Sequence, residues 1–147
     1  LLSMSRPEES IGFLLSDTVR LMRAEFNRRL RQHGITLARA KTLWRLAQEP
    51  GLRQVELAQV LEIAPMTLVR LLDRLAKAGH IERRRDPGDR RAFRLYTTPA
   101  AKPALALIGR TAKEVRAIAL RGLARAERDA LQRGLRVIKR NLAKGTP

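Results

Sequence analysis

The sequence contains no cysteine, and this absence excludes several kinds of site at once. Disulfide bonds, thiolate metal sites, cysteine nucleophiles and thiol redox sensors all need the missing side chain. Oxidation to sulfenic acid or to a disulfide therefore cannot act as a switch in this protein. We expect any switch to be a bound ligand instead.

Long apolar segments are missing as well. No run approaches the roughly 18 consecutive apolar residues that indicate a membrane-spanning helix. The opening LLSMSRPEES lacks the apolar core of a signal peptide. These absences predict a cytoplasmic protein without a membrane partner. Because Met4 is the first methionine, we interpret Leu1–Ser3 as either an added remnant or an upstream extension.

The motifs of catalysis and metal binding are also missing. The sequence has no phosphate-binding glycine loop, no His-Glu-x-x-His and no nucleophile elbow, and its carboxylates are scattered over polar faces. The two histidines, His33 and His80, lie far apart, and His33 beside Gly34 is interpreted as a helix-terminal residue. We therefore predict no enzyme, no metal site and no cofactor.

Basic charge is what the sequence has in excess. It contains 31 Lys and Arg against 14 Asp and Glu, a formal net charge of +17. An excess of this size favours polyanionic partners such as nucleic acid or an acidic membrane surface. The 147 residues, 44% of them hydrophobic, suffice for one domain with a core but not for two ordinary ones. The sequence therefore predicts one basic domain, spanning residues 1–147.

The spacing of apolar residues predicts a mainly α-helical fold with one small β-hairpin. Helical periodicity covers six segments, and period-two alternation covers two short strands. The expected helices are Ile11–Leu30, Leu37–Ala47, Gln54–Leu61 and Pro65–Ala78, followed by one segment striped by Leu105, Ile108, Val115 and Ile118 and another striped by Leu131, Leu135, Ile138 and Leu142. The expected strands are His80–Arg85 and Ala92–Thr98.

The helix expected at 65–78 has one apolar face and one outward polar face. A short helix, a tight turn and such a second helix are typical of the helix-turn-helix, whose second helix enters the major groove of DNA. Arg70 can donate two hydrogen bonds to guanine, Thr67 can bond a base or phosphate, and Met66 can pack on a thymine methyl. The candidate DNA-binding residues of this helix are Pro65, Met66, Thr67 and Arg70, with Arg74 and Lys77 for phosphates. A surface helix with solvated charges is the alternative.

The segment between the two strands predicts a second contact with DNA, in addition to that of the helix at 65–78. Residues 83–94 hold six arginines and two aspartates, Asp86 and Asp89, around a Pro-Gly turn. A narrow ribbon tip can insert an arginine into the minor groove. The candidates are Arg90 and Arg91, and we expect Asp89 to hold one of their guanidinium groups in position. The alternative is an exposed turn held by salt bridges.

At these residues the chain resembles the MarR family of bacterial winged helix-turn-helix regulators, nearest to its SlyA-like branch. The resemblance covers the family's second helix, recognition helix and wing, in order and spacing: Q-V-E-L-A-Q-V-L at 54–61, P-M-T-L-V-R-L-L-D-R-L at 65–75 and D-P-G-D-R-R-A at 86–92. His80 stands where the family commonly has leucine, and L-Y-T-T at 95–98 departs from the leucine-x-leucine-threonine pattern with which the family's second wing strand usually ends.

The resemblance implies a division of the chain and a function. Residues of about 37–98 would form the winged helix-turn-helix lobe, and about 10–34 and 101–144 would form dimerisation helices. The apolar stripes agree, because a single small domain could scarcely bury Ile11, Leu14, Leu15, Ile138 and Leu142, although packing within one chain is the alternative. We expect a homodimeric, sequence-specific regulator of transcription that binds double-stranded DNA. A nonspecific nucleic-acid-binding or architectural protein, which would rely on charge alone, is the alternative.

The resemblance also implies a repressor whose DNA binding is relieved by a small, aromatic or anionic ligand. Trp44 and Tyr96 could line a pocket for it, but lone aromatic residues at helical spacing are more often core, and we interpret both as core residues. The many arginines of the last helix are interpreted as a solvated face. They include Arg125, Arg128, Arg133, Arg136 and Arg140.

Overall fold

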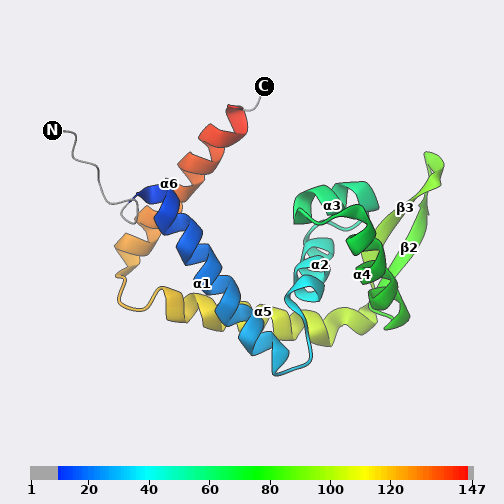
Figure 1. Ribbon diagram of the computed structural model, residues 1–147, viewed down its shortest axis with the longest axis horizontal. Helices are drawn as coiled ribbons and strands as arrows, with labels where there is room; N and C mark the ends of the chain where they lie inside the picture. Colours follow the sequence, from blue (N-terminus) through cyan, green and yellow to red (C-terminus); the bar gives the residue numbers. More distant parts are fainter. Residues whose placement is uncertain (1–9, 146–147) are drawn as a thin grey trace.

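The computed structural model describes residues 10–145 and confirms a mainly helical fold with a small wing (Figure 1). The prediction about Leu1–Ser3 lies outside the described residues. None of the helices in the described part is long and apolar enough to cross a membrane. The elements, in chain order, are α1 (Ile11–Arg31), α2 (Leu37–Gln48), β1 (Leu52–Arg53), α3 (Gln54–Leu61), α4 (Pro65–Lys77), β2 (Ile81–Asp86), β3 (Asp89–Thr97), the short 3-10 helix η2 (Pro99–Ala101), α5 (Lys102–Ala119) and α6 (Arg125–Lys144).

Short polar side chains and one proline fix where the helices begin. The hydroxyl oxygen of Ser10 accepts a hydrogen bond from the backbone N–H of Phe13 at the start of α1. Thr36 does the same for the N–H of Arg39 at the start of α2. Pro65 opens α4, where its missing N–H costs no helical hydrogen bond. These local signals explain why the helix starts were predictable from the sequence.

The wing is part of a three-stranded antiparallel sheet in the order β1-β3-β2. The sequence did not predict β1, because two residues are too few to show an alternating pattern. The hairpin is also tighter than predicted, since Asp86 pairs with Asp89 across a turn of only Pro87 and Gly88. Arg90 and Arg91 consequently belong to strand β3 and not to a loop.

The hydrophobic core lies in the winged helix-turn-helix lobe. It is formed by the inner faces of α2, α3 and α4, the base of the sheet and the first half of α5. Its fully buried members include Leu43, Leu46, Leu57, Leu68, Leu72, Leu75 and Leu95. By contrast, the only fully buried residue of α1 is Leu30, and within its described length α6 buries none. The lobe therefore buries its own core, whereas most of α1 and the described length of α6 are left exposed.

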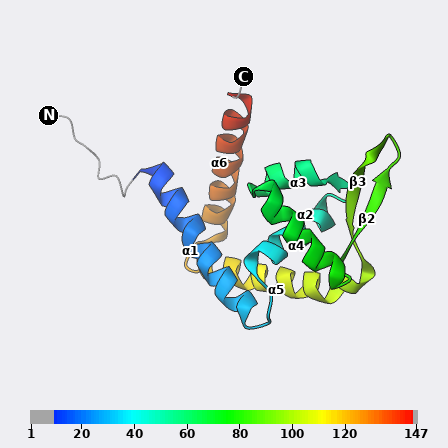
Figure 2. The same cartoon turned by 45° about the vertical axis from the view of Figure 1, so that its right-hand side comes forward.

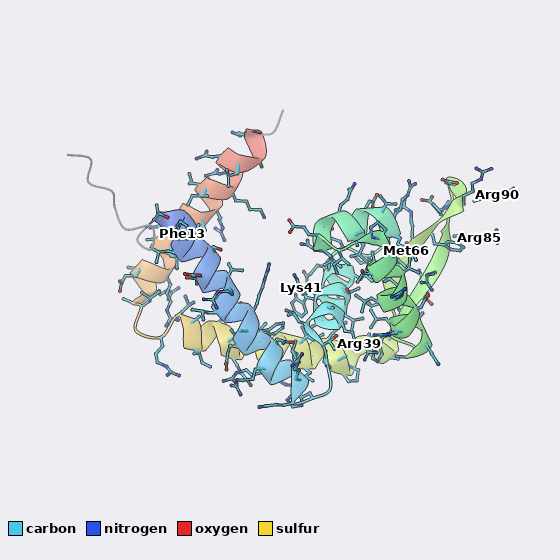
Figure 3. The ribbon with its side chains drawn as sticks, viewed as in Figure 1. Phe13, Arg39, Lys41, Met66, Arg85 and Arg90 are labelled. Carbon is cyan, nitrogen blue, oxygen red and sulfur yellow. The ribbon has the colours of Figure 1, made fainter. Side chains whose placement is uncertain are left out.

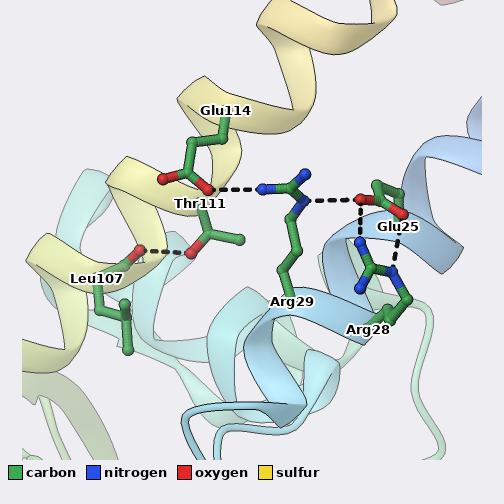
Figure 4. Close-up of polar contacts among 6 residues, drawn as sticks. All are labelled: Glu25, Arg28, Arg29, Leu107, Thr111 and Glu114. Atoms are coloured by element: carbon green, nitrogen blue, oxygen red, sulfur yellow. Dashed lines mark hydrogen bonds and ion pairs between the residues drawn. The ribbon is translucent and has the colours of Figure 1, made fainter.

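A charged network attaches the end of α1 to α5 (Figure 4). The carboxylate of Glu25 accepts hydrogen bonds from Arg28 and Arg29, at 2.7 Å each, and Arg29 also donates to Glu114 of α5 at 2.9 Å. The hydrogen bonds from Arg28 and Arg29 lower the pKa of Glu25 to about 2. Glu25 therefore stays ionised at physiological pH and remains paired with Arg28 and Arg29.

The turn before β1 is fastened to the wing at Gly51. Its backbone has φ +88°, a left-handed conformation that glycine adopts without steric cost. Its N–H donates to the carbonyl of Leu95 at 2.9 Å, and its carbonyl accepts from Arg94 at 3.1 Å. A Cβ added here would lie 3.0 Å from the Tyr96 hydroxyl oxygen. The junction thus requires glycine for two separate reasons.

We expect Gly51→Ala to destabilise the fold more than Gly79→Ala. Both glycines have positive φ, which costs an alanine about 1–2 kcal/mol, but nothing lies within 4 Å of a Cβ at Gly79. The crowding against Tyr96 should add about 1 kcal/mol at Gly51, and Tyr96→Phe should recover part of it. Denaturant unfolding of Gly51→Ala, Gly79→Ala, Tyr96→Phe and the double variant Gly51→Ala/Tyr96→Phe measures these differences. Equal losses for the two glycine variants would refute the role of Tyr96.

Candidate nucleic-acid interface

Helices α3 and α4 form a helix-turn-helix. The turn passes through Glu62, whose backbone has φ 53°, and reaches α4 at Pro65. Leu68, Leu72 and Leu75 are buried, so the apolar face of α4 is fixed against the lobe. The opposite face of α4 is consequently held outward in one orientation.

The structure places all six candidate residues of α4 on its exposed surface. Pro65, Met66 and Thr67 lie at the N-terminal end, and 67% of Met66 is exposed. Arg70, Arg74 and Lys77 follow along the helix and are exposed as well. A major-groove helix presents its N-terminal residues to the base edges, and this arrangement has the required geometry.

The wing projects beyond the lobe at the end of the molecule away from α6 (Figures 1 and 2). Arg90 extends from its tip and Arg85 from its side (Figure 3). Successive residues of a strand point to opposite faces, so Arg90 and Arg91 project in different directions. The structure thus separates two candidates that the sequence treated together.

The carboxylate of Asp86 holds the wing in place. Asp86 is only 5% exposed, at the end of β2. One carboxylate oxygen accepts from Arg53 at 2.7 Å and from Arg94 at 3.1 Å, and the other accepts from the backbone N–H of Gly88 at 2.8 Å. The Gly88 N–H and the two guanidinium groups lower the pKa of Asp86 below its usual range, although burial opposes them. One charged group therefore joins the turn, β3 and the start of α3.

The arginines of the wing divide into two sets. Arg83 pairs with Asp73 of α4 at 2.7 Å and so joins the wing to the recognition helix. Arg84 pairs with Glu82 and lies over the Tyr96 ring, 4.2 Å from its centroid, and Arg94 is held by Asp86. In the described part of the chain, Arg85, Arg90 and Arg91 have no carboxylate partner. Only this second set is available to an outside anion.

The predicted bracing role of Asp89 is wrong. Its carboxylate accepts from the backbone N–H of Arg91 at 2.9 Å and not from a guanidinium group. The short Asp89 side chain bonds the backbone two residues on, as aspartate commonly does in turns, and does not contact the guanidinium group of Arg90 or Arg91. The pair that holds the wing in place is instead Asp86 and Arg53, which the sequence did not single out.

Arg85 is a further candidate for DNA contact that sequence reasoning missed, because nothing in the sequence distinguishes it from its paired neighbours.

A cavity of about 570 Å³ lies where α1, α2, α3 and α5 meet. Its walls combine apolar and basic side chains with one carboxylate, Glu62. They include Arg23, Phe26, Lys41, Trp44, Arg45 and Ile108. The interpretation of Trp44 as a core residue is wrong, because 42% of it is exposed at this cavity. Tyr96 does not line the cavity and packs in the wing beside Arg84.

We expect Asp86→Asn to lower the melting temperature and weaken DNA binding by loosening the wing. The folded-state pKa of Asp86 is lowered, so its stabilisation is present above the ordinary pKa of about 3.8 and is lost as the pH falls through the folded value. The difference in melting temperature between Asp86→Asn and the unmodified protein should therefore persist from pH 8 to pH 5 and shrink only in stronger acid. Thermal unfolding across pH measures this. Asp89→Asn is the control, since its amide oxygen can still accept from Arg91, and equal losses for the two variants would contradict the prediction.

Comparison with known proteins agrees with this geometry. The model of the MarR family matches residues 35–93. The transcriptional regulator PA3341 is 38% identical over 92% of this chain and 99% of its own, with a TM-score of 0.80. A crystal structure of MarR is 28% identical over 97% of each chain, with a TM-score of 0.82. The transcriptional regulator SlyA, at 24% identity over 92% of this chain and 95% of its own, shares the fold with a TM-score of 0.76.

The family model covers the helix-turn-helix and most of the wing, and the match to PA3341 extends over 92% of the chain. The chain belongs to the MarR family of DNA-binding transcriptional regulators.

Proposed function

We propose that this protein is a sequence-specific, dimeric repressor that a small aromatic or anionic ligand releases from its DNA operator. The observation that carries the proposal is the distribution of unpaired basic groups. Arg70, Arg74 and Lys77 on α4 have no carboxylate partner among the described residues, and neither do Arg85 and Arg90 on the wing. An unpaired guanidinium group can bind a base or a phosphate without first breaking an ion pair.

Each surface would contribute different information. The α4 helix would lie in the major groove, where Arg70 can donate two hydrogen bonds to guanine. The wing would reach the minor groove, where Arg90 would contribute charge and sense groove width. Arg74 and Lys77 would bind phosphates and fix the orientation of the helix.

The dimer would form through α6 and the exposed part of α1. Large apolar residues are exposed on both helices, among them Ile11, Phe13, Leu14 and Leu21 on α1 and Leu131, Leu135 and Ile138 on α6. Exposed apolar surface on this scale favours an interface. A second copy is the partner that fits, because a two-fold axis would bring two recognition helices to one duplex.

The cavity beside Trp44 would hold the ligand. Arg23 and Lys41 supply positive charge, while Phe26 and Trp44 supply apolar aromatic surface, so an aromatic carboxylate matches its walls. Val60 and Leu61 of α3, and Glu62 of the turn that follows it, line the same cavity. A ligand that prefers one position of α3 relative to α1 would therefore shift the spacing of the two recognition helices and weaken operator binding.

We expect Arg70→Ala and Arg90→Ala to weaken DNA binding in different ways. Arg70→Ala should cost about 1–3 kcal/mol and relax preference at one base pair per half-site. Arg90→Ala should weaken binding to many sequences and lower the salt slope by about one unit per lost phosphate contact per subunit. Titration of a base-substituted operator panel across salt measures both. Arg110→Ala, on the exposed side of α5, is the charge-matched control.

Equal, sequence-independent losses for the two variants would mean that α4 does not read bases. The protein would then be a nonspecific nucleic-acid-binding protein, which is the second candidate function.

We expect aromatic carboxylates to change the fluorescence of Trp44, the only tryptophan of the chain, and to weaken operator binding over the same concentration range. Lys41→Gln should weaken the ligand about tenfold, because a charge-assisted hydrogen bond is lost. Arg39→Gln is the matched control on α2, since Arg39 does not line the cavity (Figure 3). A ligand that quenches Trp44 without releasing DNA would contradict the proposed coupling.

A further inference from the structure

The C-terminal helix α6 carries a second group of unpaired basic residues, far along the chain from the interface described above. Residues 130–144 contain five basic residues and no acidic one. All of these residues are exposed. In the part of the chain that the structure describes, Arg133, Arg136, Lys139 and Arg140 have no carboxylate partner. The candidate DNA-binding residues of α4 and the wing likewise lack a carboxylate partner among the described residues.

These residues form a face on α6, with Arg133, Arg136 and Arg140 opposite the apolar stripe of Leu131, Leu135 and Ile138. If the stripe is covered by a second copy, the basic side stays in solvent. We call Arg133, Arg136, Lys139 and Arg140 the α6 basic face. The α6 basic face extends from Arg133 to Arg140, about 10 Å at 1.5 Å per residue. A duplex of that length carries about six phosphates.

We propose that the α6 basic face binds the phosphate backbone of a second segment of duplex DNA while the recognition helices hold the operator. The inference rests on the proposed function, because it requires a dimer already bound to DNA. Figure 1 shows α6 and the wing on opposite sides of the molecule with the lobe between them, so the partner of α6 would be a different stretch of duplex from the one under the wing. On this proposal the α6 basic face binds DNA, whereas the sequence alone suggested that these arginines only face solvent.

Duplex DNA fits this face better than a protein or a membrane. The face contains no aromatic side chain, whereas protein interfaces are usually anchored by aromatic residues. An amphipathic helix on a membrane inserts its apolar side, but that side of α6 is required by the dimer. DNA that continues from a bound operator is also present at high effective concentration. Phosphate binding needs only charge at suitable spacing, which the face provides.

The test uses beads that carry the operator duplex and are then coated with protein. A labelled duplex without the operator is added at several salt concentrations, and the amount retained per bound dimer is measured. We expect the unmodified protein to retain the second duplex. R133Q/R136Q/R140Q should lose this retention, with a drop of about 2–3 units in its salt slope. Its affinity for a short operator duplex should stay within about twofold, because α6 contributes nothing to that contact.

The control variant R110Q/R116Q/R121Q removes the same charge from exposed residues of α5 and the following turn. It should retain the second duplex, and both triple variants should sediment as dimers. Equal loss in the two variants would show an effect of net charge and overturn the proposal. Retention of polyglutamate or phosphatidylserine vesicles without retention of duplex would overturn it as well. Equal coating of operator beads and random-sequence beads would instead refute the proposed function, and with it the two-segment arrangement.

Discussion

The buried carboxylate of Asp86 is the interaction on which the DNA-facing geometry depends. It accepts from Arg53, Arg94 and the Gly88 N–H, so it joins the hairpin turn to the third strand and to the start of the helix-turn-helix. An ionised group can be buried only when it is paired, and here three donors meet that requirement. Arg83 and Asp73 add a second link, between the wing and α4. Together they give the wing one position relative to the recognition helix.

This arrangement explains how a chain with a net charge of +17 can use its arginines for two purposes. Arg53 and Arg94 share the carboxylate of Asp86, Arg83 pairs with Asp73, and all three arginines support the structure. The basic side chains of α4 and the wing that have no carboxylate partner among the described residues are exposed and available to an anion. A paired arginine would have to give up its carboxylate before binding a phosphate, whereas an unpaired one gives up only water. Because the supporting set fixes the backbone, the available set reaches DNA at defined positions.

The sequence predicted the elements of this fold well because their signals are local. The bounds of α3 were predicted as observed, and Pro65 marked the start of α4, since apolar periodicity and a helix-opening proline act within a few residues. The pairing of the arginines could not be predicted, because Arg53 and Asp86 are 33 positions apart and six arginines compete for two aspartates between residues 83 and 94. Trp44 was misplaced for a related reason: its exposure depends on a cavity between four helices that meet only in the folded chain.

The central claim is that two recognition helices of one dimer read a defined DNA sequence. Selection of bound duplexes from a random pool at physiological salt, followed by sequencing, tests it most directly. We expect a two-fold symmetric consensus whose half-sites are centred about 10 to 10.5 base pairs apart, as a pair of helices in successive major grooves requires. Tight binding that enriches no sequence, or a consensus without two-fold symmetry, would contradict the claim.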